Sequence, residues 1–123
     1  VGDKNWTRKQ WVGAMDRIAN HEHDLLRYAE QGCERLEGVR LIGKAKNKAA
    51  ILCFDVEGVH PHDVGQVLDT FGIAVRVGHH CCQPLMKHFG LVSTTRASFG
   101  LYNTLAEVDQ LVEAVSRVKG MFA

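Results

Sequence analysis

Apolar side chains recur at helical spacing over two long stretches, one in each half of the chain, with segments rich in β-branched residues between them. The first stretch covers residues 14–36 and is closed by Gly38. The second covers residues 108–118 and follows Thr104, whose spacing from Glu107 is typical of a capping box. Each stretch predicts an amphipathic helix, and the apolar stripe of such a helix has to be buried against another layer.

The segments between these helices predict short strands and two further helices. Strands are expected at 39–42, 50–56, 73–77 and 95–99, and shorter helices at 60–72 and 84–89. The polar turn at 43–48 makes the first two strands a hairpin. The order of elements predicts an α+β fold, a mixed α/β two-layer sandwich in which a small sheet of about four strands carries helices packed on it.

The length of 123 residues fits one compact domain with its own core. Residues 1–13 are mostly polar and contain Trp6 and Trp11 without sustained periodicity. We expect them to form an entry segment that is loose or docks through its tryptophans, with the domain proper over residues 14–123.

Charge and hydropathy give no reason to expect a nucleic-acid or membrane partner. The formal net charge is +1, and the longest basic stretch is the short segment 44–48. No apolar run approaches the ~20 residues that span a bilayer, and the first residues lack the apolar segment of a secretory signal. We therefore expect a cytoplasmic protein.

Four cysteines occur, at positions 33, 53, 81 and 82. The adjacent pair and the absence of a disulfide-rich pattern favour free thiols in a reducing compartment. Cys33 and Cys53 are expected on the apolar side of a helix and of a strand, where a buried cysteine behaves as a small hydrophobic residue.

The segment 76–84, Arg-Val-Gly-His-His-Cys-Cys-Gln-Pro, holds the densest reactive chemistry of the chain. Its glycine and proline favour a loop, which is where functional side chains are usually presented. A thiol is a nucleophile as thiolate, and the candidates that would stabilise this form at Cys81 are Arg76, His79 and His80. Cys82 would pack below Cys81 or act as a resolving thiol. The alternative is that these cysteines are merely buried side chains.

A zinc site is a weaker interpretation of the same residues. Four consecutive side chains, His79, His80, Cys81 and Cys82, cannot all turn toward one ion, and no Cys-x-x-Cys or His-x-x-x-His pair accompanies them. We expect no metal, and keep a metal-binding module as an alternative.

Arg96 stands among small and hydroxyl residues at the head of a predicted strand. A guanidinium there is costly to bury unpaired. Two alternatives follow: Arg96 meets an internal carboxylate, or it grips the carboxylate or phosphate of a ligand through two parallel hydrogen bonds.

Two long motifs in this order, residues 72–86 around Arg76 and Cys81 and residues 95–107 around Arg96, resemble the C-terminal part of cysteine desulfurases. The branch that they resemble is the Suf-type, selenocysteine lyase-like group of class V aminotransferases. The resemblance runs from about Ala14 to the C-terminus. It implies the fold of the C-terminal domain of fold-type I pyridoxal-phosphate enzymes.

The resemblance also implies residue roles. Cys81 matches the nucleophile that takes sulfur from L-cysteine as a persulfide, leaving alanine, for iron–sulfur cluster assembly. Arg96 matches the arginine that binds the substrate carboxylate, and Arg76 opens the family's motif near the active site. His79 and His80 belong to the same run as supporting residues. Val77 and Cys82 depart from the usual threonine and small residue, and Cys82 adds a thiol that could take up or divert the persulfide.

No segment resembles the large N-terminal domain that holds pyridoxal phosphate on a lysine. We therefore expect no cofactor on this chain and no desulfurase activity from it alone. Its partners would be the large domain, L-cysteine (or selenocysteine) and a Suf-type sulfur-acceptor protein, and apolar surface left open by the large domain could drive homo-oligomerisation. The alternative is a stand-alone persulfide carrier or sulfur-relay module.

Overall fold

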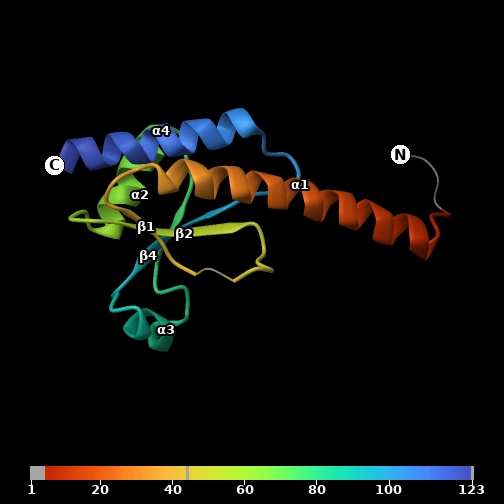
Figure 1. Cartoon of the computed structure of the whole chain (residues 1–123), viewed down its shortest axis with the longest axis horizontal. Coiled ribbons are helices and arrows are strands. Elements are labelled where there is room, and N and C mark those ends of the chain that lie inside the picture. Colours follow the sequence, from red (N-terminus) through yellow and green to blue (C-terminus); the bar gives the residue numbers. More distant parts are fainter. Residues whose placement is uncertain (1–4, 44, 123) are drawn as a thin grey trace.

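The computed structural model describes residues 5–43 and 45–122, so residues 1–4 of the expected entry segment lie outside the described residues. Over these ranges the chain forms four helices and four strands in alternating groups (Figure 1). In chain order they are α1 (Arg8–Glu34), β1 (Val39–Leu41), β2 (Ile51–Val56), α2 (Pro61–Thr70), β3 (Arg76–Gly78), α3 (Gln83–His88), β4 (Thr94–Ser98) and α4 (Leu105–Phe122).

The four strands form one antiparallel sheet in the order β1-β2-β4-β3. β1 and β2 are the predicted hairpin, with Val39 opposite Val56. β4 lies between β2 and β3, so that Arg96 has Cys53 as its partner on one side and Arg76 on the other. The predicted α+β fold is therefore confirmed.

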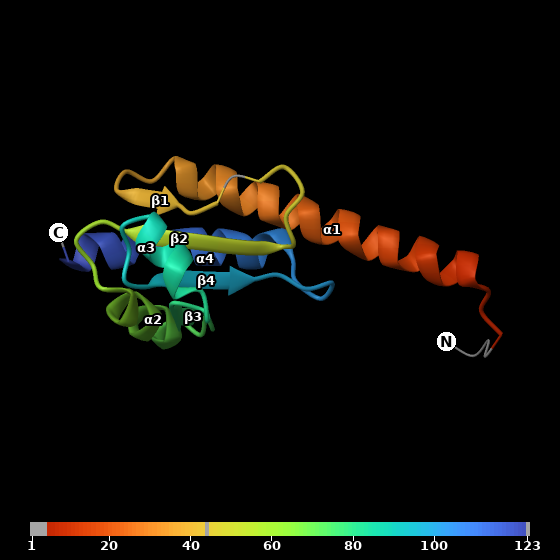
Figure 2. The ribbon, with the colours of Figure 1, turned by 90° about the horizontal axis from the view of Figure 1, so that it is seen from below.

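The helices α1 and α4 lie side by side over one face of the sheet, α2 lies beside β3, and α3 lies on the opposite side (Figures 1 and 2). Alternate residues of β2, Leu52, Phe54 and Val56, point toward the helices and are buried. They pack with buried residues of α1, α2 and α4: Leu25, Leu26, Ala29, Cys33, Val64, Leu68, Val108, Leu111, Ala114, Val115 and Val118. We call the other side, which carries the remaining β2 and β4 side chains, the open face of the sheet.

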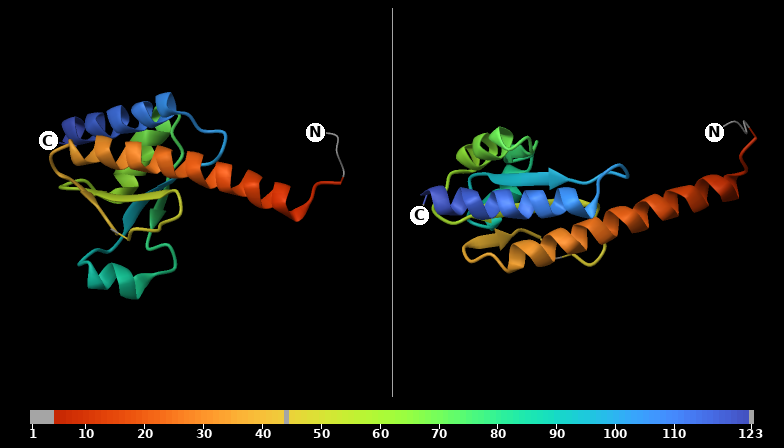
Figure 3. Two further views of the ribbon diagram at one scale, coloured as in Figure 1. Left: turned by 45° about the vertical axis from the view of Figure 1, so that its right-hand side comes forward. Right: turned by 90° about the horizontal axis from the view of Figure 1, so that it is seen from above.

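Helix α1 begins at Arg8, six residues before the start predicted from apolar periodicity. Thr7 is its N-cap and forms a capping box with Gln10, a signal that supplies hydrogen bonds to the first turn without any apolar stripe. Residues 8–13, expected in the entry segment, therefore belong to a helix whose first half projects beyond the sheet (Figure 3). The rings of Trp6 and Trp11 lie 5.1 Å apart at its tip.

The other boundaries differ from the predictions by a few residues. The strand expected at 73–77 is the short β3, and Ile73 and Val75 instead pack against the core without joining the ladder. The predicted capping interaction of α4 is present in part: the Glu107 amide donates to the Thr104 hydroxyl at 3.3 Å, and this hydroxyl donates to the Glu107 carboxylate at 3.3 Å. None of the helices within the described residues combines the length and the apolar character that would let it cross a bilayer.

We predict that the close approach of α1 and α4 leaves no room for a larger residue at Gly32 without a loss of stability. A Cβ added at Gly32 would lie 2.7 Å from a methyl carbon of Val112, a stiff β-branched side chain. Gly32→Ala should lower the free energy of unfolding by about 1–3 kcal/mol through overpacking. Urea denaturation measures this change.

Gly120 is the matched control, because it also lies in a helix but an added Cβ meets no atom within 4 Å. Gly120→Ala should raise the free energy of unfolding by about 0.5–1 kcal/mol, the usual gain in helix propensity. Equal changes for the two variants would contradict the packing argument.

Candidate functional site

The loop between β3 and α3 presents Cys81 at one end of the sheet. Gly78 ends β3 with φ 137°, a value that favours glycine. His80 and Cys81, which follow in the loop, have φ values of 53° and 59°. These left-handed conformations are uncommon for residues with a Cβ and persist when surrounding contacts hold them. The expected loop position of the cysteine pair is confirmed, and both thiols are exposed.

His79 holds the loop through two of its polar groups. Its carbonyl accepts a hydrogen bond from the amide of Cys82 at 2.8 Å. Its ring Nδ1 accepts from the amide of Cys81 at 3.2 Å. An accepting Nδ1 carries no proton, so the neutral ring has its proton on Nε2 in this arrangement.

A concave site of about 520 Å³ brings together most of the residues singled out in the sequence. It is lined by Arg76, Val77, Gly78, His79, His80, Cys81 and Arg96. We call it the arginine cavity. Cys82 is exposed but does not line this cavity.

Two guanidinium groups face this cavity without a carboxylate between them. Arg76 and Arg96 are direct cross-strand partners, a placement in which like charges destabilise a sheet. In the described part of the chain the ion pairs are Arg40–Asp55, Lys48–Glu30 and Arg117–Glu113, so none involves either residue. The Nε of Arg96 is buried and has no hydrogen-bond partner. Of the two sequence alternatives for Arg96, the internal carboxylate is wrong, and the arrangement instead suits an anionic ligand.

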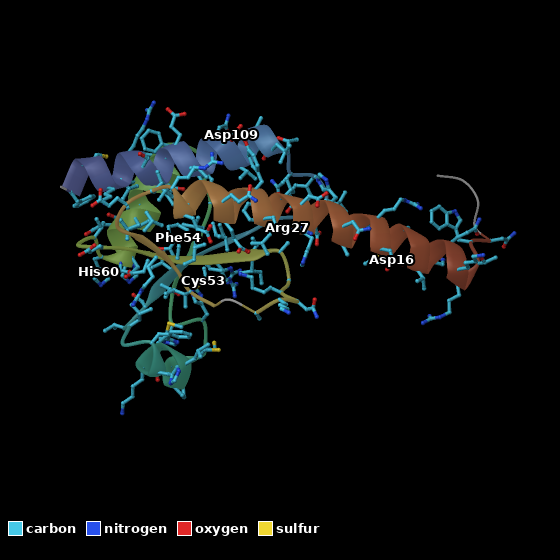
Figure 4. The ribbon with its side chains drawn as sticks, in the orientation of Figure 1. Asp16, Arg27, Cys53, Phe54, His60 and Asp109 are labelled. Carbon is cyan, nitrogen blue, oxygen red and sulfur yellow. The ribbon has the colours of Figure 1, made fainter. Side chains whose placement is uncertain are left out.

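Cys53 lies on the open face and not on the apolar side where the sequence placed it. In Figure 4, Phe54 lies on the helix side of β2 and Cys53 on the opposite side. The Cys53 thiol donates to the hydroxyl of Thr94 at 3.2 Å, and the same hydroxyl lies 3.0 Å from His80 Nε2. Thr94 is fully buried, so this hydroxyl ties the sheet to the loop that carries Cys81. Thr94 was not singled out in the sequence, because the two partners of its hydroxyl are 41 and 14 residues away.

Burial lowers the pKa of His80 below its ordinary value of 6.5, and the nearby positive charge of Arg96 lowers it further. The ring is therefore neutral at pH 7. A neutral ring whose Nε2 is unprotonated can accept a hydrogen bond from the Thr94 hydroxyl, which leaves the hydroxyl oxygen free to accept from the Cys53 thiol.

Cys33 behaves as the sequence suggested. It is fully buried in α1, and burial, followed by the charges of Glu30 and Glu34, raises the pKa of its thiol to about 11. A thiol with this pKa is inert at neutral pH. The exposed cysteines are therefore those of the loop.

Within residues 5–43 and 45–122, no group of three or more His, Cys, Asp or Glu side chains is placed to hold a metal ion. The cluster at 79–82 brings its side chains to different surroundings, as the positions of Cys81 and Cys82 show.

Comparisons with known proteins point to one family. Residues 9–111 match the aminotransferase class-V family. The chain is 49% identical to a probable cysteine desulfurase 2 of Mycobacterium leprae over 110 residues and 48% identical to a probable cysteine desulfurase of Halalkalibacterium halodurans over 108 residues. In both cases the alignment covers 88% of this chain and 26% of the relative, so the chain spans about a quarter of the relatives' length.

Solved structures give the same result. The apo cysteine desulfurase of Thermococcus onnurineus NA1 superposes with a TM-score of 0.83 at 40% identity, over 92% of this chain and 29% of that one. The Escherichia coli cysteine desulfurase CsdA, in its S-sulfonic acid form, superposes with a TM-score of 0.79 at 36% identity. The superposition covers 85% of this chain and 26% of that one.

We predict that the depressed pKa of His80 depends in part on Arg96. Titration followed by NMR should place the pKa of His80 below 6.5, and Arg96→Met should raise it part of the way back, because burial remains. Arg117→Met, which removes an arginine on α4, is the control and should leave the pKa unchanged. Since the unfolded chain binds the proton more readily, His80 should also make the fold less stable as the pH falls below about 6.5. A pKa at or above the ordinary value in the unmodified chain would contradict the assigned environment.

We predict that the Thr94 hydroxyl stabilises the loop. Thr94→Val keeps the side-chain shape but leaves the Cys53 thiol and His80 Nε2 without their shared partner. The free energy of unfolding should fall by about 1–3 kcal/mol, the cost of unsatisfied buried polar groups. Thr94→Ser retains the hydroxyl and should restore most of this loss in the same denaturation experiment. If the valine variant proves as stable as the serine variant, the hydroxyl does not hold the loop.

Proposed function

Since the chain belongs to the aminotransferase class-V family, we propose that it supplies the nucleophile-bearing part of a cysteine desulfurase, in which Cys81 takes sulfur from L-cysteine as a persulfide. The observation that carries this proposal is the shared cavity: an exposed thiol opens onto the same concave site as two arginines that have no carboxylate partner in the described residues. A nucleophile beside an anion-binding pair is what attack on an amino acid's side chain requires.

The arginines would orient the substrate. The guanidinium of Arg96 presents a planar fork that matches a carboxylate, and Arg76 adds a second positive charge at the next strand. With the substrate carboxylate held there, its sulfur would meet Cys81 Sγ across the cavity. A new bond between Cys81 Sγ and the substrate sulfur forms as the substrate C–S bond breaks. The electron pair of the C–S bond leaves on the substrate Cβ, which takes up a proton to give alanine, and alanine is then released from the arginines.

Pyridoxal phosphate, when bound, supplies the electron sink that lets the C–S bond of cysteine break. The cofactor needs a lysine amine and an acidic or basic partner for its ring nitrogen. The described lining of the arginine cavity contains neither a lysine nor a carboxylate. The residues present therefore do not fit the whole cofactor, and we assign its binding to a large domain that packs over the open face.

The same reasoning gives the partners that we propose. The exposed thiol and the resemblance of the 76–84 segment to the Suf-type branch support a sulfur-acceptor protein of iron–sulfur cluster assembly as the recipient of the persulfide. Free thiols at four positions support a reducing, cytoplasmic compartment. The second candidate, a stand-alone persulfide carrier, is favoured by the same exposed thiol and by the absence of a lysine from the described cavity lining.

A chimera tests the proposal. Residues 9–111 would replace the matching segment of the Halalkalibacterium halodurans relative, and alanine formed from L-cysteine would be measured. We expect turnover by the chimera and its loss by about a thousandfold in Cys81→Ser. Arg96→Lys keeps the charge but loses the fork, so the KM for cysteine should rise more than kcat falls. Arg40→Lys, on the open face but paired with Asp55, is the matched control.

The isolated chain, given pyridoxal phosphate and L-cysteine, should form no alanine. Turnover by the isolated chain, or full activity of the Cys81→Ser chimera, would overturn the proposal. A chimera that is inactive while the isolated chain still accepts sulfur at Cys81 from a donor would favour the carrier instead.

A further inference from the structure

We propose that Cys82 is a second sulfur-carrying residue, which takes the outer sulfur of a Cys81 persulfide and presents it outside the arginine cavity. This inference rests on the proposed function of Cys81 and extends it with a transfer step inside the chain. It assigns a role to the thiol that the desulfurase mechanism leaves unused.

The two neighbouring thiols have different surroundings. Cys81 lines the arginine cavity, whereas Cys82 is exposed and is not part of that lining. Cys82 is the residue before α3, its backbone amide is held by the His79 carbonyl, and its side chain makes no capping hydrogen bond. α3 lies on the side of the sheet away from α1 and α4 (Figure 2). A persulfide sulfur on Cys82 would therefore be exposed outside the arginine cavity, while a persulfide sulfur on Cys81 would face this cavity.

The backbone of the loop allows the two sulfurs to meet. Consecutive Cα atoms are about 3.8 Å apart, so the two thiols come within reach of each other when both side chains turn to the same side. Cys81 is held in its left-handed conformation at φ 59° by the hydrogen bond from its amide to His79 Nδ1. Rotation of the His79 ring breaks that bond and lets Cys81 relax toward the conformations that residues with a Cβ prefer. The hydrogen bond from the Cys82 amide to the His79 carbonyl also spans Cys81, so this change of backbone acts on two hydrogen bonds of the loop.

Geometry favours transfer of the outer sulfur over formation of a Cys81–Cys82 disulfide. A disulfide suits Cα atoms about 5.5–6 Å apart, and adjacent residues in a trans peptide are held closer than this. The outer sulfur of a persulfide lies a further ~2 Å from the Cys81 Sγ. Attack at that outer atom places three sulfurs in a longer bridge, which adjacent residues can span with less strain.

The transfer balances without an added oxidant or reductant. The thiolate of Cys82 attacks the outer sulfur of the protonated persulfide on Cys81. The bond between Cys82 Sγ and that sulfur forms as the bond to Cys81 Sγ breaks, and the electron pair leaves on Cys81 Sγ, which then takes a proton from solvent. One S–S bond replaces another, and Cys81 is returned as a free thiol ready for a further substrate.

The test follows one sulfur atom between two neighbouring residues. The full chain would be loaded with a small persulfide donor, cysteine persulfide, and freed of the donor by rapid desalting. Samples taken over time would be blocked with an alkylating agent and digested with trypsin, which releases residues 77–87 as one peptide because Arg76 and Lys87 flank it. Fragmentation between positions 81 and 82 then reports which cysteine carries the extra sulfur.

We expect the sulfur to leave Cys81 and appear on Cys82 at a rate that does not change on about tenfold dilution, as an intramolecular step requires. In Cys82→Ser the sulfur should remain on Cys81. In Cys81→Ser the occupancy of Cys82 should show only direct loading and should not grow after the donor is removed. A mixture of loaded Cys82→Ser chain with unloaded Cys81→Ser chain should show no transfer on the same timescale.

Three results would overturn the inference. They are sulfur that stays on Cys81 in the unmodified chain, a transfer rate that scales with protein concentration, and release of sulfide with a Cys81–Cys82 disulfide. In each of these Cys81 is still loaded, so the proposed function of Cys81 survives. Failure of Cys81 to accept sulfur in either the unmodified chain or Cys82→Ser would overturn the relay and count against the proposed function as well.

Discussion

The alternation of side chains along β2 and β4 is the constraint on which the site depends. Leu52 and Phe54 are buried under the helices, so their neighbours, Cys53 among them, must face the other way. Residues paired across two antiparallel strands face the same side of the sheet. Ala97, opposite Leu52, therefore joins the core, and Arg96, opposite Cys53, lies on the open face. A slip of one residue would exchange the two faces and bury a guanidinium in hydrocarbon. The apolar packing of one face therefore fixes the chemistry of the other.

Charged side chains on the open face are paired at one end of the sheet and unpaired at the other, where the arginine cavity lies. Toward β1, Arg40 is matched by Asp55, as expected for a solvated sheet surface. Toward β3, Arg76 and Arg96 stand side by side without a described carboxylate. Such a pair lowers the stability of the fold in the absence of a ligand and gains from an anion that neutralises it. Binding of an anionic ligand between the two arginines would recover the stability lost there, so this part of the sheet is suited to binding.

The sequence was sufficient for the elements but not for every face. The helices followed from apolar spacing and the hairpin from a polar turn between two β-branched segments. The side of Cys53 could not be decided, because the run Ile51-Leu52-Cys53-Phe54 is apolar throughout and shows no alternation. The start of α1 was missed for the opposite reason, since the capping box of Thr7 and Gln10 opens a helix whose first turns have no apolar stripe. The left-handed conformations of His80 and Cys81 carry no glycine or asparagine signal, and so only tertiary contacts reveal them.

The loop that carries Cys81 combines a fixed base with a loosely held tip. At the base, His80 Nε2 is tied to the buried hydroxyl of Thr94, which is itself held by the Cys53 thiol on the neighbouring strand. At the tip, the Cys81 amide is held by one exposed histidine ring. A nucleophile that passes on a bound sulfur has to face its substrate in one state and the acceptor of that sulfur in another. These two demands conflict if the whole loop is rigid. His80, the residue before the proposed nucleophile Cys81, is anchored to the sheet, while the amide of Cys81 is held by one exposed hydrogen bond, and this arrangement satisfies both demands.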